Sequence, residues 1–273
     1  MSDAADRVQA PFGRREVFVD QSDDLGPYRV FSCTDHDGPR PTAGQFYMLS
    51  ASERWGGGVD ERPYLPRAIS VLAASDERLS FLLEAIGPGT ERLVELGAGD
   101  AVQLLGPLGK GFTAPPDGTR AILCGGGIGI APLSMLHDEL ASAGRDVTTL
   151  LGFRDAEHAK GATTIEDANV ATDDGSVGHA GLVTELLLTE LERDPGAIIY
   201  SCGPPQMLDA VRAISLASGV PAQLALEAPM ACGYGACYGC VFKVEDGSFR
   251  RACVDGPVIL ADQLAVDWLE GEG

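Results

Sequence analysis

The 273-residue chain predicts a small antiparallel β-barrel, then an α/β domain with a parallel sheet, then a short cysteine-rich segment. Many short β-like runs separated by turns fill the first part of the chain. After a proline-rich linker, apolar strands alternate with amphipathic helices. Near the C-terminus, three of the seven cysteines fall within nine residues. The predicted ranges are 14–114 for the barrel, 117–227 for the α/β domain, 228–260 for the cysteine segment and 261–273 for a C-terminal helix or tail.

The composition narrows the classes of function. The chain holds 40 Asp plus Glu against 20 Lys plus Arg, a formal charge of −20, so its field would repel nucleic acid and anionic lipid. We therefore expect neither nucleic acid nor a membrane as a partner. No run is long enough to span a bilayer, and "MSDAADRVQA" lacks the apolar stretch of a secretory signal. These features predict a cytoplasmic protein, in which clustered thiols usually bind metal or do redox work.

The barrel prediction depends on six runs in the first domain: "EVFVD", "YRVFSC", "QFYMLS", "AISVLA", "LSFLLEA" and "AVQLL". One helix is expected after "GPGT", over "ERLVELG", because its apolar residues have helical spacing and Gly97 ends the pattern. The insert at 52–62, "SERWGGGVDER", is predicted to be a loop and suggests no function.

The α/β domain is predicted after the linker "APPDG" at 114–118. Apolar strands followed by amphipathic helices indicate βαβ units and a parallel sheet. The expected elements are "RAILC", "IAPLSMLHDELASA", "VTTLLGF", "GLVTELLLTELE", "AIIYSC", "PQMLDAVRAISLAS" and "PAQLALE". A last helix is expected over "ADQLAVDWLE", residues 261–270.

The cysteine segment has the pattern Cys232-x4-Cys237-x2-Cys240-x12-Cys253. A C-x4-C-x2-C run with a distant fourth cysteine is the plant-type ferredoxin spacing for a 2Fe–2S cluster. The glycines between the cysteines allow the backbone to wrap closely and point N–H groups at sulfur. "VFKVEDGSFRRAC" is predicted to be a hairpin that turns at Asp246-Gly247 and returns Cys253 to the loop.

Structural zinc is the main alternative, because four thiolates also bind zinc. Zinc ribbons usually have two matched C-x-x-C pairs, and this chain has one, so the cluster is preferred. Cys33 and Cys124 lie in apolar strands and are predicted to be small core residues.

Four further motifs are weak when each is taken alone. "ILCGGGIGIAPL" places glycines between a strand and a helix, where a pyrophosphate could approach the backbone. "SCGPPQML" puts Cys202 at the carboxyl end of a later strand, the edge at which parallel sheets bind ligands; a simply buried thiol is an equal alternative. "RAIS" at 67–70 offers a guanidinium and a hydroxyl, and "GPGT" at 87–90 opens a helix with glycines and a threonine cap.

The order of these motifs resembles the ferredoxin–NADP reductase superfamily, and the C-terminal segment resembles that of electron-transfer subunits of type B dihydroorotate dehydrogenases. The resemblance covers roughly residues 27 to 260. It implies FAD between the two domains, NAD(H) on the GGGIG side and a 2Fe–2S cluster at the C-terminus. It also implies an FMN-containing dihydroorotate dehydrogenase catalytic subunit as partner, in a heterotetramer.

Carried over by position, the resemblance implies these roles. The flavin would be held by Arg67, Ala68, Ile69 and Ser70, and its diphosphate by Gly87, Gly89 and Thr90. The nicotinamide dinucleotide would be bound by Gly126, Gly127, Gly129, Cys202, Gly203 and Pro204. The cluster ligands would be Cys232, Cys237, Cys240 and Cys253. Relatives often have R-P-[IL]-S, and here Ala68 stands in the proline's place.

The implied function is an electron relay, a flavin- and iron–sulfur-dependent NAD(P)H oxidoreductase subunit in pyrimidine biosynthesis. The cofactors supply the chemistry, and no residue is predicted to act as acid, base or nucleophile. The close alternative is a related reductase subunit that serves a hydrogenase, a sulfide dehydrogenase or a ferredoxin-dependent transhydrogenase. An alternative of another class is a non-catalytic interaction protein with structural zinc.

Two further expectations concern specificity and docking. After "VTTLLGF", Asp155 and Glu157 would repel a 2′-phosphate whereas Arg154 could attract one, and on balance we expect NAD(H). The partner contact is expected at Met230, Tyr234 and Tyr238, with packing over the cluster as an equal alternative.

The four histidines are predicted to be surface residues: His36, His137, His158 and His179.

Overall fold

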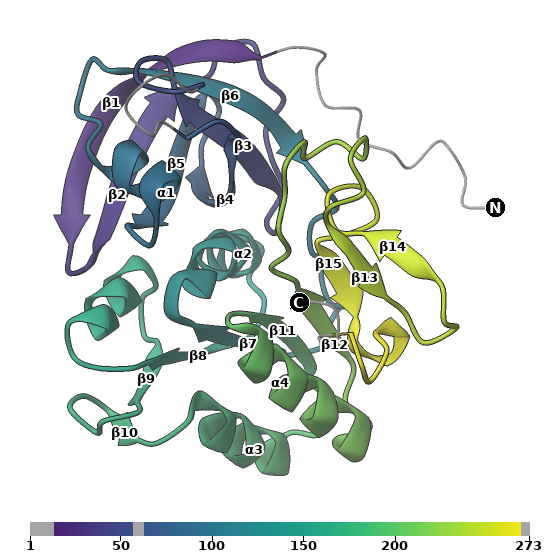
Figure 1. Ribbon diagram of the computed structural model, residues 1–273. Coiled ribbons are helices and arrows are strands. Elements are labelled where there is room, and N and C mark those ends of the chain that lie inside the picture. The colour runs from purple at the N-terminus through teal and green to yellow at the C-terminus, as the bar shows by residue number, and fades with distance from the viewer. Residues whose placement is uncertain (1–13, 57–62, 269–273) are drawn as a thin grey trace.

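A computed structural model describes residues 14–56 and 63–268, so 57–62 of the insert lie outside the described residues. The first domain is a closed antiparallel barrel with strand order β1-β2-β5-β4-β3-β6, which confirms the predicted class (Figure 1). Buried residues such as Phe31, Tyr47 and Phe81 fill its interior. Its strands are β1 (Arg15–Leu25), β2 (Tyr28–Thr34), β3 (Phe46–Ala51), β4 (Arg67–Ala74), β5 (Arg78–Glu84) and β6 (Ala101–Leu108).

The barrel's helix, α1 (Pro88–Val94), begins earlier than the sequence pattern predicted. Pro88 occupies the first turn, where its fixed φ suits a helix and its missing N–H is not needed. Gly87 is therefore the N-cap, and Thr90, expected as the cap, lies inside the helix. Its Oγ1 accepts a hydrogen bond from the Ile86 N–H (3.0 Å) and donates one to the Gly87 carbonyl (3.1 Å).

The second domain has a seven-stranded sheet, order β10-β9-β8-β7-β11-β12-β15, that is parallel except for β15. Helix α2 lies between this sheet and the barrel, and α3 and α4 cover the other face (Figure 1). The strands are β7 (Ala121–Gly126), β8 (Val147–Phe153), β9 (Asn169–Thr172), β10 (His179–Ala180), β11 (Ile198–Cys202), β12 (Ala222–Ala225) and β15 (Val258–Leu260). The helices are α2 (Ile130–Ser142), α3 (Val183–Arg193) and α4 (Pro205–Ser218), with 3-10 turns η2 (Gly127–Gly129) and η3 (His158–Thr164).

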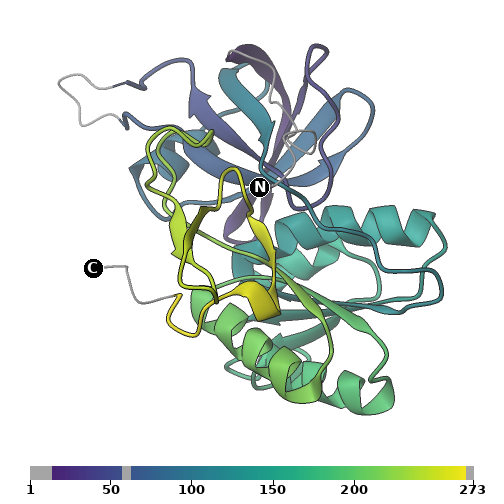
Figure 2. The same cartoon turned by 90° about the vertical axis from the view of Figure 1, so that its right-hand side faces the viewer.

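The C-terminal part of the chain lies along one side of both domains, as the two views of Figures 1 and 2 show. The hairpin of β13 (Val241–Lys243) and β14 (Phe249–Arg251) forms as predicted. Strand β15 then joins the edge of the parallel sheet beside β12. The cysteine segment is thus tied to the α/β domain by backbone pairing.

The helix expected over 261–270 is wrong for its described part, 261–268. A single 3-10 turn, η4 (Ala261–Gln263), is followed by a bridge between Leu264 and Val244. The Leu264 carbonyl accepts a hydrogen bond from the buried Arg212 Nε at 3.0 Å. Pairing with the hairpin and with α4 therefore prevails over the helical periodicity of the segment.

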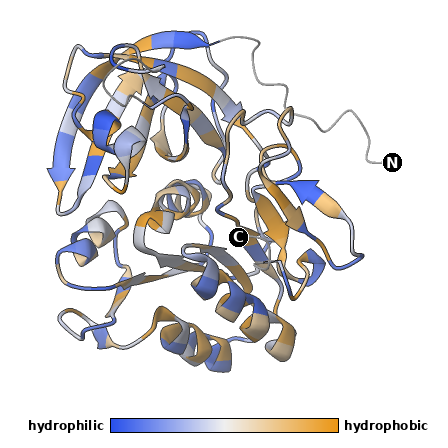
Figure 3. Ribbon diagram, viewed as in Figure 1, coloured by the Kyte–Doolittle hydropathy of each residue, from blue (hydrophilic) through white to orange (hydrophobic). Residues whose placement is uncertain are grey.

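The junction between the domains is hydrogen-bonded rather than loose. The Thr113 carbonyl accepts bonds from the Tyr200 hydroxyl (3.0 Å) and the Gln223 amide (2.8 Å), and the Thr113 N–H donates to Gln223 (2.8 Å). Along α3 and α4 the hydropathy alternates, as expected of helices with one buried face (Figure 3). Among residues 14–56 and 63–268, we find no helix that is both long and apolar enough to cross a bilayer.

Candidate functional site

Arg67, at the start of β4, lies directly against the first turn of α1. A Cβ at Gly89 would stand 2.2 Å from the Arg67 Nε, so the guanidinium occupies the space that a side chain at position 89 would take. The Arg67 Nη1 donates to the Leu65 carbonyl at 2.6 Å, and its Cζ lies 5.8 Å from the centre of the Trp55 ring. Closure of the barrel thus brings the R-x-x-S and G-x-G-T motifs together, although 20 positions separate Arg67 from Gly87.

The remaining residues of both motifs border the same region. Ala68, Ile69 and Ser70 are partly exposed along β4, and Gly87 has open space where a side chain would be. In the neighbouring strand, Met48 is the register partner of Ala68. The half-open edge of β4 and the turn at Gly87 could therefore be covered by a bound molecule.

The two loops at the carboxyl ends of β7 and β11 pack tightly on each other. A Cβ at Gly129 would lie 2.4 Å from the Cys202 carbonyl oxygen and 2.6 Å from the Gly203 Cα. A Cβ at Gly126 would meet the Met207 Sδ at 2.6 Å. Gly129 is thus required for packing between the loops, because its neighbours are backbone atoms, whereas at Gly126 the flexible Met207 side chain could move aside.

Gly127 begins the 3-10 turn that leads into helix α2, and Pro204 immediately precedes helix α4. Gly127 has φ +53°, which favours glycine, and nothing lies within 4 Å of its would-be Cβ. Pro204 is the N-cap of α4. The open space at Gly127 and the helix beginning at Ile130 give a backbone surface suited to a phosphate.

The Cys202 thiol is buried at the end of β11, with 6% of the residue exposed. Burial raises its pKa strongly, and the charge of Glu227 raises it further, against a smaller lowering by the Gly203 N–H. Cys202 is therefore a neutral thiol at physiological pH. Cys33 and Cys124 are fully buried core residues, as predicted.

The four cysteines of the C-terminal segment come in two pairs. The Sγ atoms of Cys240 and Cys253 lie 3.2 Å apart, and Cys237 is near enough to Cys232 to lower the pKa of its thiol. The predicted hairpin has thus returned Cys253 to the loop. Across the described ranges, no three His, Cys, Asp or Glu side chains surround one point as a single metal ion would require. Two thiolate pairs suit a two-iron cluster, in which each iron takes two protein ligands.

Backbone N–H groups point at the sulfurs of the first pair. The Ala236 N–H donates to the Cys232 Sγ (3.3 Å) and the Gly239 N–H to the Cys237 Sγ (3.4 Å). Burial raises the pKa of Cys232, but hydrogen bonds from Cys237, Tyr234 and Ala236 outweigh it and lower the pKa to about 7. This loop is therefore prepared to hold thiolate, the form that binds metal. The pKa of Cys253 is raised by burial and by its neighbour Cys240.

The cysteine loop, which carries Cys232, Cys237 and Cys240, packs against the barrel beside the R-x-x-S motif. Gly233 has φ +78°, and a Cβ there would lie 2.5 Å from the Met48 Cγ. Met48 in turn pairs with Ala68 in the barrel sheet. The buried Met48 side chain therefore separates Gly233, next to Cys232, from the R-x-x-S motif at 67–70.

The end of β8 differs in part from its prediction. Asp155 accepts hydrogen bonds from the His158 N–H (2.9 Å) and ring (2.7 Å), and Glu157 pairs with Lys160 (2.7 Å). The prediction of a surface histidine is wrong for His158, which is 8% exposed and packs edge-on against Tyr28 of the barrel. Arg154 lies 3.7 Å from Glu84, also in the barrel.

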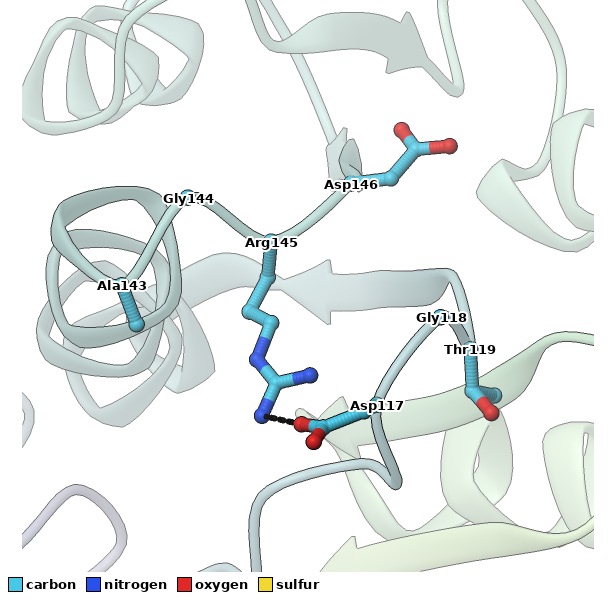
Figure 4. A pocket seen from close by; sticks show the side chains of 7 residues that line it. All are labelled: Asp117, Gly118, Thr119, Ala143, Gly144, Arg145 and Asp146. Carbon is cyan, nitrogen blue, oxygen red and sulfur yellow. Dashed lines mark ion pairs between the residues drawn. The ribbon is translucent and has the colours of Figure 1, made fainter.

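A separate pocket opens at the amino ends of strands β7 and β8, at the other end of the strands from the loops described above (Figure 4). Asp117 and Arg145 form an ion pair across it at 2.5 Å. It lies where β7 and β8 begin, whereas open α/β sheets bind ligands at the carboxyl ends of their strands. We assign it no role in the site described above.

Comparison with known proteins agrees with this arrangement. A family model described as the iron–sulfur cluster binding domain of dihydroorotate dehydrogenase B matches residues 227–265. The electron transfer subunit of dihydroorotate dehydrogenase B (NAD(+)) from Clostridium acetobutylicum is 38% identical over 227 residues, which are 82% of this chain and 86% of that protein. The chain belongs to this family. The subunit of the same name from Geobacillus thermodenitrificans is 41% identical over 82% of the chain and 86% of its own length.

Solved structures show the same fold at lower identity. The match to an NADH-dependent reduced ferredoxin-NADP oxidoreductase spans 95% of this chain and 94% of that protein's chain, with a TM-score of 0.78 and 24% identity. A ferredoxin NADP+ reductase from Neisseria gonorrhoeae with bound FAD and NADP covers 76% of the chain and 92% of its own, with a TM-score of 0.58 and 22% identity. The barrel followed by a parallel-sheet domain is therefore a fold shared with flavin reductases.

Sequence reasoning missed three residues that touch these motifs: Trp55, Met48 and Arg251. Trp55 belongs to an insert that suggested no function, and Met48 lies in an ordinary apolar strand. Arg251 stands two positions before Cys253, and that closeness in sequence is the one signal that could have identified it.

Proposed function

We propose that the chain is the electron-transfer subunit of a dihydroorotate dehydrogenase B, and that it relays electrons between NAD(H) and an FMN-containing catalytic subunit in pyrimidine biosynthesis. The observation that carries the proposal is the contact of the cysteine loop with the barrel. Gly233 packs on Met48, and Met48 pairs with Ala68. A one-electron site and a flavin site would thus be neighbours within one chain.

FAD would be held where β4 meets α1. The Arg67 guanidinium, which lies against Gly89, supplies positive charge for the diphosphate beside the open backbone at Gly87. Thr90 fixes this turn through its bonds to Ile86 and Gly87. The polar Ser70 and the half-buried Ala68 and Ile69 would border the ring system of the flavin.

NAD(H) would be bound by the paired loops at the ends of β7 and β11. The open backbone at Gly127 would receive the diphosphate, and Cys202, Gly203 and Pro204 would border the nicotinamide. The neutral Cys202 thiol offers a polarisable surface without a charge that would attract water. When bound, the flavin would exchange hydride with the nicotinamide ring and single electrons with a 2Fe–2S cluster.

The cluster would take Cys232 with Cys237 on one iron and Cys240 with Cys253 on the other. The protein contributes the N–H groups that stabilise thiolate and the hairpin that closes the second pair. Four thiolates in two pairs favour this group over zinc, whose structural sites gather four ligands around one ion.

The partner would dock beside the exposed aromatic side chains of the cysteine segment. Tyr234, Tyr238 and Phe249 are each at least 60% exposed, although aromatic side chains of this size are usually covered. Tyr238→Ala is expected to lower activity with the partner while the cluster stays intact. An unstable cluster in this variant would instead indicate packing. A heterotetramer would form if two such pairs associate.

The purified chain tests the function as a whole. Alone, it is expected to oxidise NADH with ferricyanide as acceptor and to leave dihydroorotate unchanged. Addition of the catalytic subunit is expected to start dihydroorotate-dependent reduction of NAD⁺. Turnover of dihydroorotate by the isolated chain, or no gain on adding that subunit, would contradict the proposal.

A further inference from the structure

A single arginine, Arg251 in strand β14 of the hairpin, contacts the cysteine loop. The Arg251 Nη1 donates to the Gly235 carbonyl at 3.0 Å, and its Cζ lies 4.9 Å from the centre of the Tyr238 ring. Gly235 lies between Cys232 and Cys237, and Tyr238 lies between Cys237 and Cys240. The guanidinium therefore spans both intervals between the three ligands of the loop.

The cysteine loop has no charge of its own. Residues 228–242 contain no Asp, Glu, Lys, Arg or His. The Arg251 side chain is 24% exposed, so water screens it less than it would a free surface charge. Asp255 lies 3.7 Å from the Arg251 Nε and also accepts the Arg251 N–H at 3.0 Å. Arg251 thus brings a positive charge to an uncharged loop, with one carboxylate as its counter-ion.

We propose that Arg251 sets the reduction potential of the cluster through its charge. The inference rests on the proposed function, because it presumes that the cysteines hold a 2Fe–2S cluster. Net charge and hydrogen bonding around the sulfurs determine such potentials. Each one-electron reduction adds one negative charge between the thiolates, and a nearby guanidinium stabilises that charge. Arg251 therefore favours the reduced form, and Asp255 opposes it.

The adjacent Arg250 provides a matched control. Successive residues of a strand point to opposite faces. The Arg250 Nη1 accordingly donates to Gln263 at 3.1 Å, toward η4 and away from the cysteine loop. Arg250→Gln removes the same charge from the same strand without touching the loop.

The experiment measures the cluster potential in Arg251→Gln, Arg251→Lys, Asp255→Asn, Arg250→Gln and the unaltered protein, by redox titration monitored with electron paramagnetic resonance. Arg251→Gln is expected to lower the equilibrium constant for reduction about tenfold, a shift of about 59 mV to lower potential. Arg251→Lys is expected to keep most of the potential, because it keeps the charge. Asp255→Asn is expected to shift the potential upward, and Arg250→Gln is expected to change the constant by less than about threefold.

Equal potentials in Arg251→Gln and Arg250→Gln would overturn the inference, as would a large drop in Arg251→Lys. If Arg251→Gln binds no cluster, Asp255→Asn decides, since an unchanged potential there would also overturn it. A merely structural role would lower iron content in Arg251→Gln and Arg251→Lys alike, without moving the potential of the clusters that remain. If the unaltered protein binds no 2Fe–2S cluster, the proposed function fails first, and iron analysis shows this separately.

Discussion

Gly129→Ala tests whether the two loops of the nucleotide site depend on their close contact. Gly129 has φ −63° and ψ −7°, so alanine is compatible with the backbone there. The new Cβ would nevertheless stand 2.4 Å from the Cys202 carbonyl oxygen and 2.5 Å from its carbon. Both are backbone atoms, which cannot turn aside as a side chain could.

The size of the effect follows from this geometry. To restore van der Waals contact, the loops must separate by about 1 Å. Overpacking of this kind costs about 1–3 kcal/mol, and alanine gains nothing over glycine at this N-cap position of α2. We expect the free energy of unfolding to fall by about 1–3 kcal/mol. A shift of about 1 Å in a positioning loop can lower a rate by about 10²-fold, and we expect that loss for NADH oxidation.

Urea denaturation and NADH–ferricyanide assays measure the two effects. Gly97→Ala is the control, because nothing lies within 4 Å of its would-be Cβ and its φ lies outside the left-handed region. It is expected to change stability by less than about 0.5 kcal/mol. A Gly129→Ala protein as stable and active as the Gly97→Ala protein would refute the reasoning.

Three other predictions follow from the site. Cys237→Ser is expected to lose the cluster absorbance and to keep its flavin, since the two sites use separate segments; a normal cluster signal would show that the ligand assignment is wrong. NADH is expected to reduce the protein faster than NADPH, because Asp155 and Glu157 would repel a 2′-phosphate, and a strong preference for NADPH would reverse this assignment. In cluster-free protein, iodoacetamide is expected to label Cys232 readily at pH 8 and less as the pH falls through about 7, since only the thiolate reacts. The native Cys202 thiol, with its pKa raised by burial, should resist labelling at pH 8, and equal labelling of both by mass spectrometry would contradict the burial described here.

The sequence predicted the features that depend on residues close to one another in the chain. Short β-like runs separated by turns predicted the six barrel strands, and the cysteine spacing with the Asp246-Gly247 turn predicted the return of Cys253 to the cysteine loop. The short strands β9 and β10 were missed, because four and two residues give too little periodicity. The closing helix over 261–270 was predicted from a pattern that ignores the bridge from Leu264 to Val244.

Features that depend on distant segments could not be predicted in this way. The contact of Arg67 with Gly89 arises from closure of the barrel, and that of Gly233 with Met48 from packing of the cysteine loop on it. His158 has a polar sequence context but is buried where the α/β domain meets Tyr28. Resemblance to a family supplied the proposed roles of Arg67 and Cys202, which local pattern alone left open.

The relay itself is tested most directly by adding NADH to the isolated chain without oxygen and recording the electron paramagnetic resonance spectrum. We expect NADH to bleach the flavin and a reduced 2Fe–2S signal then to appear in the same chain, with about two irons per chain. A protein stripped of flavin is expected to show no such signal with NADH but to show it with dithionite. A flavin that NADH reduces while the cluster stays oxidised over long incubation, or a chain that holds zinc in place of iron, would contradict the account.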